Sequence, residues 1–150
     1  MIQGKEVKEM SAENHAVVIR SLFNAFNEGD VGRGAALVTQ DFELIDVAIG
    51  QTFHGPDGLR QWLQSFLTAG PDAKTRILTT IVEGEWVATE HIGTLTHTGP
   101  LLTPAGEIAP TGRRVELQIA EIYQMKDGKI ALLRAYYDVA TMMRQLGLMP

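Results

Sequence analysis

Two acidic residues in the C-terminal half stand where a carboxylate could move a proton. Asp138 ends residues 129–138, a predicted strand with apolar side chains on both of its faces. A carboxyl group at the end of an apolar surface has a raised pKa, which a general acid or base needs near neutral pH. The alternative is that Asp138 caps a helix starting at Val139, and the two interpretations are compatible.

Glu121 is the second candidate, because it is the one acid on an otherwise apolar face of the strand predicted over residues 113–125. Such an acid is costly unless it is paired or functional. The structural alternative is an ion pair with Arg134 on the neighbouring strand. The functional interpretation makes Glu121 a proton-transfer group beside Tyr123, which shares its face.

Histidines supply a further possible group, a hydrogen-bond donor to a substrate oxygen. His91 and His97 share one face of the strand predicted over residues 86–98. Six residues of strand separate them by about 20 Å, too far to hold one metal ion. Core or surface roles are therefore favoured over a metal role, with His97 kept as the donor candidate.

Other chemistries find no support in the sequence. It contains no cysteine, which excludes disulfides and thiolate chemistry. It also contains no phosphate-binding glycine pattern and no helical zinc motif. We therefore predict acid–base chemistry without a metal or cofactor.

Composition narrows the class of partner. The 150 residues carry a formal net charge of -5, and 45% of them are hydrophobic. A mildly acidic chain without a basic stretch argues against nucleic acid and against anionic membranes as partners. The absence of a signal-like start or a long apolar run predicts a cytoplasmic protein.

The secondary structure that must position these groups is predicted to change from helices to strands along the chain. One domain is predicted over residues 1–150, with a flexible lead-in over residues 1–10 and a first helix capped by Ser11. Helical spacing predicts further helices at about 32–38 and 56–67. After them comes a run of strands in which Asp127-Gly128 predicts a tight hairpin turn. Helices followed by an antiparallel meander indicate an α+β fold.

Several short motifs, in order, resemble a known family. They are residues 26–30 (FNEGD), 53–59 (FHGPDGL), 93–99 (GTLTHTG), 111–113 (TGR) and 127–130 (DGKI), with Tyr137-Asp138 and Gln145-Leu146-Gly147 at the end. Together they resemble the SnoaL-like polyketide cyclases, also called ester cyclases, of the nuclear-transport-factor-like superfamily. The resemblance covers about residues 14–147.

The resemblance implies a cone-shaped curved antiparallel sheet, with N-terminal helices enclosing a hydrophobic pocket, usually in a homodimer or larger assembly. It also implies a cofactor-independent enzyme in which an aspartate at the position of Asp138 closes a ring by an intramolecular aldol step. Arg134 departs from the family pattern, which commonly has an aromatic residue there. It suggests an anionic or carbonyl substrate, or a couple with Asp138 or Glu121.

The predicted function is therefore acid–base catalysis, by cyclisation or isomerisation, on a small hydrophobic carbonyl compound. Asp138 is the predicted catalytic group, with Glu121 and His97 as the other catalytic candidates. Seven residues are predicted to bind the substrate: Phe23, Trp62, Phe66, Ile119, Tyr123, Arg134 and Tyr136. A non-catalytic ligand-binding or dimerisation module is the alternative. Water activation by Glu121, Arg134 and Asp138, as in epoxide hydrolases, is a lesser one.

A homodimer is also expected from the sheet itself, since three short helices cannot cover both of its faces. Either the face carrying Val115, Leu117 and Ile119 or the opposite face would meet a second subunit.

Overall fold

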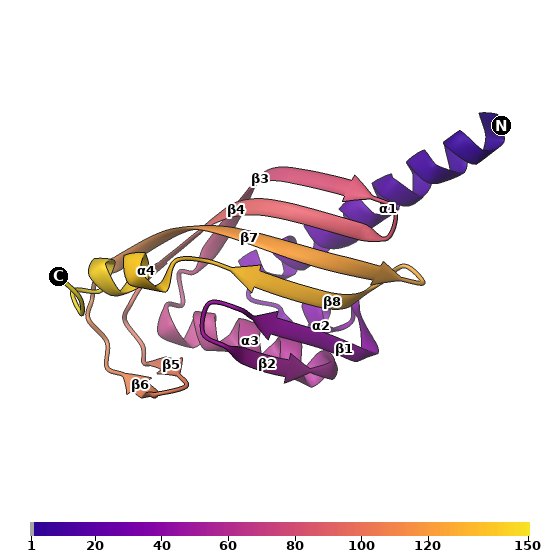
Figure 1. The fold of residues 1–150 in the computed structure, drawn as a ribbon. Coiled ribbons are helices and arrows are strands. Elements are labelled where there is room, and N and C mark those ends of the chain that lie inside the picture. Colours follow the sequence, from indigo (N-terminus) through magenta and orange to yellow (C-terminus); the bar gives the residue numbers. More distant parts are fainter. Residues whose placement is uncertain (1) are drawn as a thin grey trace.

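The computed structural model describes the backbone of residues 2–150 and the side chains of residues 11–150 (Figure 1). Its helices are α1 (Ile2–Asn27), α2 (Val31–Ala35), α3 (Gly55–Ala69) and α4 (Val139–Gln145). Its strands are β1 (Val38–Asp46), β2 (Gln51–His54), β3 (Lys74–Glu83), β4 (Trp86–Thr96), β5 (Leu101–Thr103), β6 (Gly106–Ile108), β7 (Arg114–Lys126) and β8 (Lys129–Tyr136). This order confirms the predicted α+β class.

The main sheet has six strands in the order β2-β1-β8-β7-β4-β3. Its pairings are antiparallel except for β1 with β8, which run parallel. The prediction of a purely antiparallel sheet is therefore wrong at this one pairing. No hairpin joins β1 to β8, so nothing in the local sequence fixes their relative direction.

The helices cover only one face of the sheet. In the view of Figure 1, α1 and α3 lie behind the strands, so the opposite, outer face is turned to the viewer. Apolar side chains from the helices and the inner face form the main core, among them Ile19, Phe42, Leu59, Tyr123 and Leu133. This one-sided packing leaves a space between sheet and helices in which a site can lie.

Of two local predictions, one is confirmed and one is wrong. The structure confirms the tight turn at Asp127-Gly128, where both residues have positive φ angles, 51° and 77°. The predicted helix start at Ser11 is wrong, because α1 already begins at Ile2. Residues 5–10 are mostly good helix formers, so no break separates them from the rest of the helix.

An extra residue in β8 changes which side chains face inward. Met125 pairs with Ile130 but Gln124 pairs with Leu132, so Ala131 has no partner across the ladder. Such a bulge reverses the alternation of the strand. Ile130 and Leu133 both become buried, although the two-residue period predicts opposite faces for them.

Candidate active site

A pocket of about 130 Å³ lies between the inner face of the sheet and helices α1 and α3. Its wall is mostly aliphatic and aromatic, with aromatic rings from Phe23, Phe26, Trp62 and Phe66. Its polar side chains are few and include His91, His97, Glu121 and Tyr137. An apolar cavity with a few polar groups is the usual form of a small-molecule site.

Glu121 lies on β7 and points into this space, with 4% of its surface exposed. The hydroxyl of Tyr123 donates a hydrogen bond to its Oε1 at 2.8 Å, and the hydroxyl of Thr89 lies 3.0 Å from the same phenol oxygen. Burial raises the pKa of Glu121 to about 7. A carboxyl group in this range can both accept and release a proton near neutral pH.

His91, on β4, faces Glu121 across a short gap. Its Nδ1 is 3.7 Å from Oε1 of Glu121, and its ring packs edge-on against Phe23 with centroids 4.7 Å apart. Burial lowers the pKa of His91 to about 4. Near pH 5.5 both groups are therefore neutral, and His91 is a hydrogen-bond donor rather than a cation.

Asp46 forms a second buried cluster next to the pocket. It ends β1 and is fully buried, and its Oδ2 accepts hydrogen bonds from Trp62 Nε1 at 3.0 Å and from the Tyr137 hydroxyl at 2.9 Å. Burial raises its pKa, and its charge in turn adds to the raised pKa of Glu121. Asp46 thus fixes two side chains of the pocket wall.

The structure does not bring Asp138 to the pocket. Its exposed carboxylate caps α4, accepting from the backbone N–H of Thr141 at 3.2 Å and from the Thr141 hydroxyl at 2.8 Å. These hydrogen bonds hold the pKa of Asp138 below its usual value. The expectation of a raised pKa on an apolar surface is therefore wrong, and the capping alternative is the arrangement observed.

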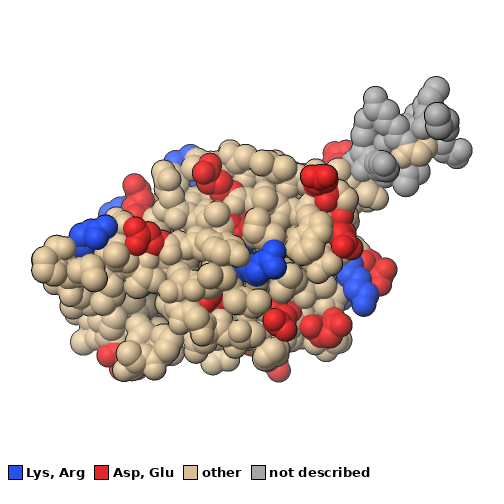
Figure 2. All heavy atoms as spheres, viewed as in Figure 1, with Lys and Arg blue, Asp and Glu red and all other residues tan. Residues whose placement is uncertain are grey.

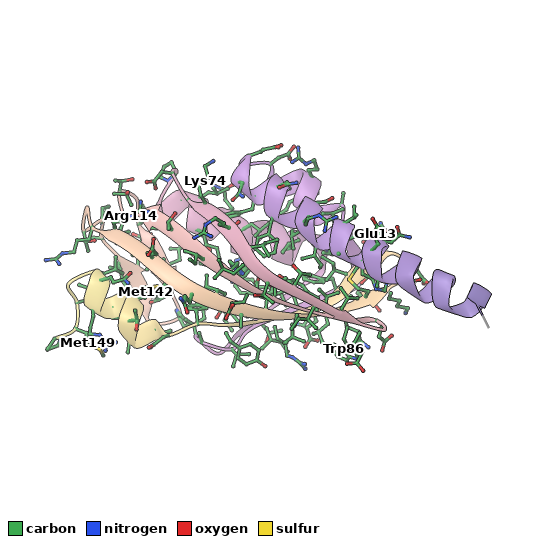
Figure 3. All side chains as sticks on the ribbon, turned by 90° about the horizontal axis from the view of Figure 1, so that it is seen from above. Glu13, Lys74, Trp86, Arg114, Met142 and Met149 are labelled. Carbon is green, nitrogen blue, oxygen red and sulfur yellow. The ribbon has the colours of Figure 1, made fainter. Side chains whose placement is uncertain are left out.

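Arg134 and Tyr136 are also placed outside the pocket, which corrects two of the predicted binding residues. Beyond the bulge at Ala131 they lie on the outer face, where the Arg134 guanidinium stacks 5.7 Å from the centre of the Trp86 ring. Figure 3 shows Trp86 on the side of the sheet away from α1.

The predicted couple of Arg134 with Glu121 is wrong for the same reason, since Glu121 lies across from Ala135 on the inner face. The set of Glu121, Arg134 and Asp138 needed for epoxide-hydrolase-like water activation does not converge. That alternative loses its structural basis.

The other predicted residues are distributed as follows. Phe23, Trp62, Phe66 and Ile119 line the pocket, whereas Tyr123 is fully buried behind Glu121. His97 lines the pocket too, but far from Glu121. The cross-strand partner of Glu121 is Thr89, at the other end of β4 from His97.

Asp46, His91 and Tyr137 are site residues that the sequence interpretation did not select. For Asp46 a signal existed, because it alternates with Phe42 and Leu44 on one strand face, as Glu121 does on its own strand. Tyr137 follows Leu133 and Ala135 at the two-residue period, and no motif marks it as a site residue. Within the described residues, no three His, Asp or Glu side chains are grouped as a metal site requires.

Comparisons with known proteins agree with this architecture. The chain is similar to a candidate SnoaL-like polyketide cyclase from Jannaschia sp. CCS1, with 18% identity, a TM-score of 0.81, and 93% and 95% of the two chains covered. It is similar to IdmH, a candidate polyketide cyclase from Streptomyces antibioticus, with 26% identity, a TM-score of 0.71, and 89% and 98% covered. An LEH-like epoxide hydrolase from M. tuberculosis has 19% identity and a TM-score of 0.70, with 91% of each chain covered.

No curated protein sequence matches the chain. None of the described helices combines the length and apolar character that a membrane-spanning helix needs. The family model of the SnoaL-like polyketide cyclases matches residues 7–146, nearly the whole chain. The chain therefore belongs to the SnoaL-like polyketide cyclase family.

Proposed function

We propose that the protein is a cofactor-independent acid–base enzyme acting on a small hydrophobic carbonyl compound, with Glu121 as the proton-transfer group. One observation carries the proposal: the carboxyl group of Glu121 is buried in an apolar pocket with a pKa of about 7, 3.7 Å from a neutral histidine. Groups with strongly shifted pKa values in a cavity are typical of active sites.

The chemistry assigned to this pair is enolisation. Tyr123 occupies Oε1 of Glu121, so Oε2 takes the proton from the carbon next to a carbonyl group. The electrons of that C–H bond form a C=C bond while the carbonyl oxygen gains negative charge. The adjacent His91 donates a hydrogen bond to this oxygen, since a neutral imidazole is a suitable electrophile in such steps.

The enolate can react in two ways, and Glu121 gives its proton back in each. The enolate carbon attacks a second carbonyl group of the same molecule, forming a C–C bond, and the new alkoxide takes the proton back from Glu121. Otherwise Glu121 returns the proton to a different carbon, which gives an isomer. The aldol closure is favoured for this chain because it belongs to a polyketide cyclase family.

Asp46 supports the site without touching the substrate in this proposal. Its carboxylate holds Trp62 and Tyr137, which line the pocket on two different elements, α3 and the segment after β8. A fixed wall keeps a bound ketone in one orientation relative to Glu121, and orientation is a large part of catalysis.

The test measures exchange of the acidic C–H of 2-tetralone, an apolar bicyclic ketone, for deuterium by NMR in heavy water. The wild-type protein is expected to accelerate the exchange, and Glu121→Gln to lower the rate by about 10²–10⁴. Asp138→Asn, the matched control, is expected to leave it unchanged. Equal exchange by wild type and Glu121→Gln would contradict the proposal. Binding of the ketone without any exchange would favour the non-catalytic ligand-binding alternative.

We also propose a homodimer formed through the outer face of the sheet. Val115, Leu117 and Ile119 line the pocket, so the opposite face is the one left for a partner. Five large apolar side chains there are between 38% and 61% exposed: Val47, Leu78, Ile81, Trp86 and Tyr136. Figure 2 shows acidic and basic residues only scattered across this side.

Light scattering after gel filtration tests the dimer. Ile81→Lys is expected to shift the mass to that of a monomer, because it places a charge in the apolar interface. Leu102→Lys makes the same change on the exposed β5–β6 hairpin and is expected to leave the dimer intact. A monomeric wild-type protein would contradict the proposal.

A further inference from the structure

Backbone hydrogen bonds fix His97 and the two residues after it in place. It directly follows β4, its backbone N–H donates to Arg113 O at 2.8 Å, and its carbonyl accepts from Gly112 N at 2.8 Å. The next residues, Thr98 and Gly99, both donate to Ala69 O at the end of α3. Gly99 lies so close to Thr68 that a Cβ there would overlap its carbonyl oxygen.

The hydrogen bonds of the ring determine which nitrogen carries the hydrogen. The backbone N–H of Thr111 donates to Nδ1 of His97 at 3.2 Å, and a backbone N–H can only donate. The Thr111 hydroxyl also lies 3.0 Å from Nδ1 and itself accepts from Arg113 N. Nδ1 is therefore an acceptor, and the neutral ring carries its hydrogen on Nε2.

Nε2 of His97 is a buried donor without a partner in the described structure. The side chain is 1% exposed and lines the pocket, while Thr111, which holds the Nδ1 edge, is not part of the pocket wall. Nε2 therefore lies on the part of the ring that Thr111 does not hold. Because buried polar groups are nearly always hydrogen-bonded, this donor indicates an acceptor on the bound molecule.

The position of His97 sets where that acceptor lies. His91 is close to Glu121, and six residues of strand, about 20 Å when extended, separate His91 from His97. The wall between the two ends includes Leu95, Leu117 and Ile119, all apolar. The pocket therefore has a histidine near each end, and the wall between them is mostly apolar but also includes Thr75 and Thr94.

We infer that the pocket selects elongated apolar carbonyl compounds that carry a second oxygen acceptor at the far end, bound by the Nε2–H of His97. His97 is in this role a specificity-determining residue, not part of the proton transfer. The inference rests on the proposed function for the end at Glu121, because it places the reacting carbonyl there.

The test compares ligands that differ only at the far end. 4-Phenylphenol and trans-4-hydroxystilbene offer a phenol as an enol mimic for the Glu121 end, in two lengths. Their 4′-methoxy derivatives add one acceptor oxygen and no donor. In wild-type protein the methoxy group of the better-fitting length is expected to improve binding roughly three- to tenfold, as one hydrogen bond does.

His97→Phe is expected to abolish this gain, so that both members of the pair bind equally. His54→Phe, which replaces an exposed histidine, is the matched control and is expected to keep it. A gain that survives in folded His97→Phe would overturn the inference, as would no binding of any of the four phenols to the wild type.

Histidine ¹⁵N NMR of the wild-type protein keeps the inference testable if His97→Phe does not fold. His97 is expected to show the tautomer with hydrogen on Nε2, and only the methoxy ligands are expected to shift that nitrogen. A hydrogen on Nδ1, or an unmoved Nε2, would overturn it. Glu121→Gln separates the two proposals, since it is expected to stop 2-tetralone exchange yet keep the methoxy preference.

Discussion

Glu121 and Asp138 are two acids of one chain in opposite surroundings. Glu121 is almost fully buried in the pocket wall, and burial raises its pKa to about 7. Asp138 is exposed at the start of α4, and its hydrogen bonds with Thr141 lower its pKa. The C-terminal motif singles out Asp138, but it is the environment of Glu121 that raises a carboxyl pKa toward neutrality. A carboxylate's chemistry thus follows from its solvation more than from its position in a motif.

The largest effect expected from this contrast is on stability as a function of pH. Folded Glu121 keeps a proton between pH 4.5 and about 7 that the unfolded chain has lost, so its contribution falls as pH rises. Folded His91 lacks a proton between pH about 4 and 6.5 that the unfolded chain holds, so its contribution rises. In the wild type the two effects nearly cancel.

Single substitutions remove this compensation. In Glu121→Gln the free energy of unfolding is expected to rise by roughly 3 kcal/mol from pH 4 to 6.5, and in His91→Gln to fall by roughly 3 kcal/mol from pH 4.5 to 7. Urea denaturation across this range measures both. Parallel curves for the two variants would show that the buried pair does not titrate as described.

The second effect is on the rate. If ionised Glu121 is the base, kcat/KM for 2-tetralone exchange is expected to fall about tenfold for each pH unit below 7. Asp138→Asn is expected to give the same profile, because Asp138 lies outside the pocket. A profile that changes in Asp138→Asn and not in Glu121→Gln would reverse the assignment of the two acids.

The third effect concerns Asp138 as a helix cap. Asp138→Ala is expected to cost about 1 kcal/mol of unfolding free energy, since it removes the hydrogen bond to the Thr141 N–H. Asp138→Ser retains a capping oxygen and is expected to recover most of that loss. Thermal melts at neutral pH measure the difference, and unchanged exchange activity in both variants is part of the expectation.

The smallest expected effect is the shift in the midpoint of the pH–rate profile when the Tyr123 hydroxyl is removed. The hydrogen bond from Tyr123 lowers the pKa that burial raises, so Tyr123→Phe is expected to move the midpoint of the pH–rate profile to higher pH. Tyr136→Phe, on the outer face, is the control and is expected to leave the midpoint in place. A midpoint that moves to lower pH would contradict the role given to this hydrogen bond.

Much of the architecture follows from local patterns. The helical spacing around Leu59 and Trp62, the turn at Asp127-Gly128 and the lone acid at Glu121 are all local signals, and the structure has each element where they indicate. The local patterns carry no information about contacts between segments that lie far apart in the chain. The parallel pairing of β1 with β8 and the hydrogen bonds that join Asp46 to Tyr137 depend on segments far apart in the chain.

The prediction of which β8 side chains share a face is wrong for a different reason. The two-residue period assumes an unbroken ladder, and the unpaired Ala131 breaks it. The period predicts Arg134 and Tyr136 on the face of Ile130, whereas the structure has Leu133 on that inner face instead. No composition signal marks this bulge, because alanine fits either face.

The unpaired Ala131 also bears on how such a gene can change. Deleting its single codon would restore a regular ladder with Ile130 still opposite Met125 and Leu132 still opposite Gln124, so Arg134 and Tyr136 would stay on the outer face. The last strand can thus lose this residue without exchanging the side chains that line the cavity.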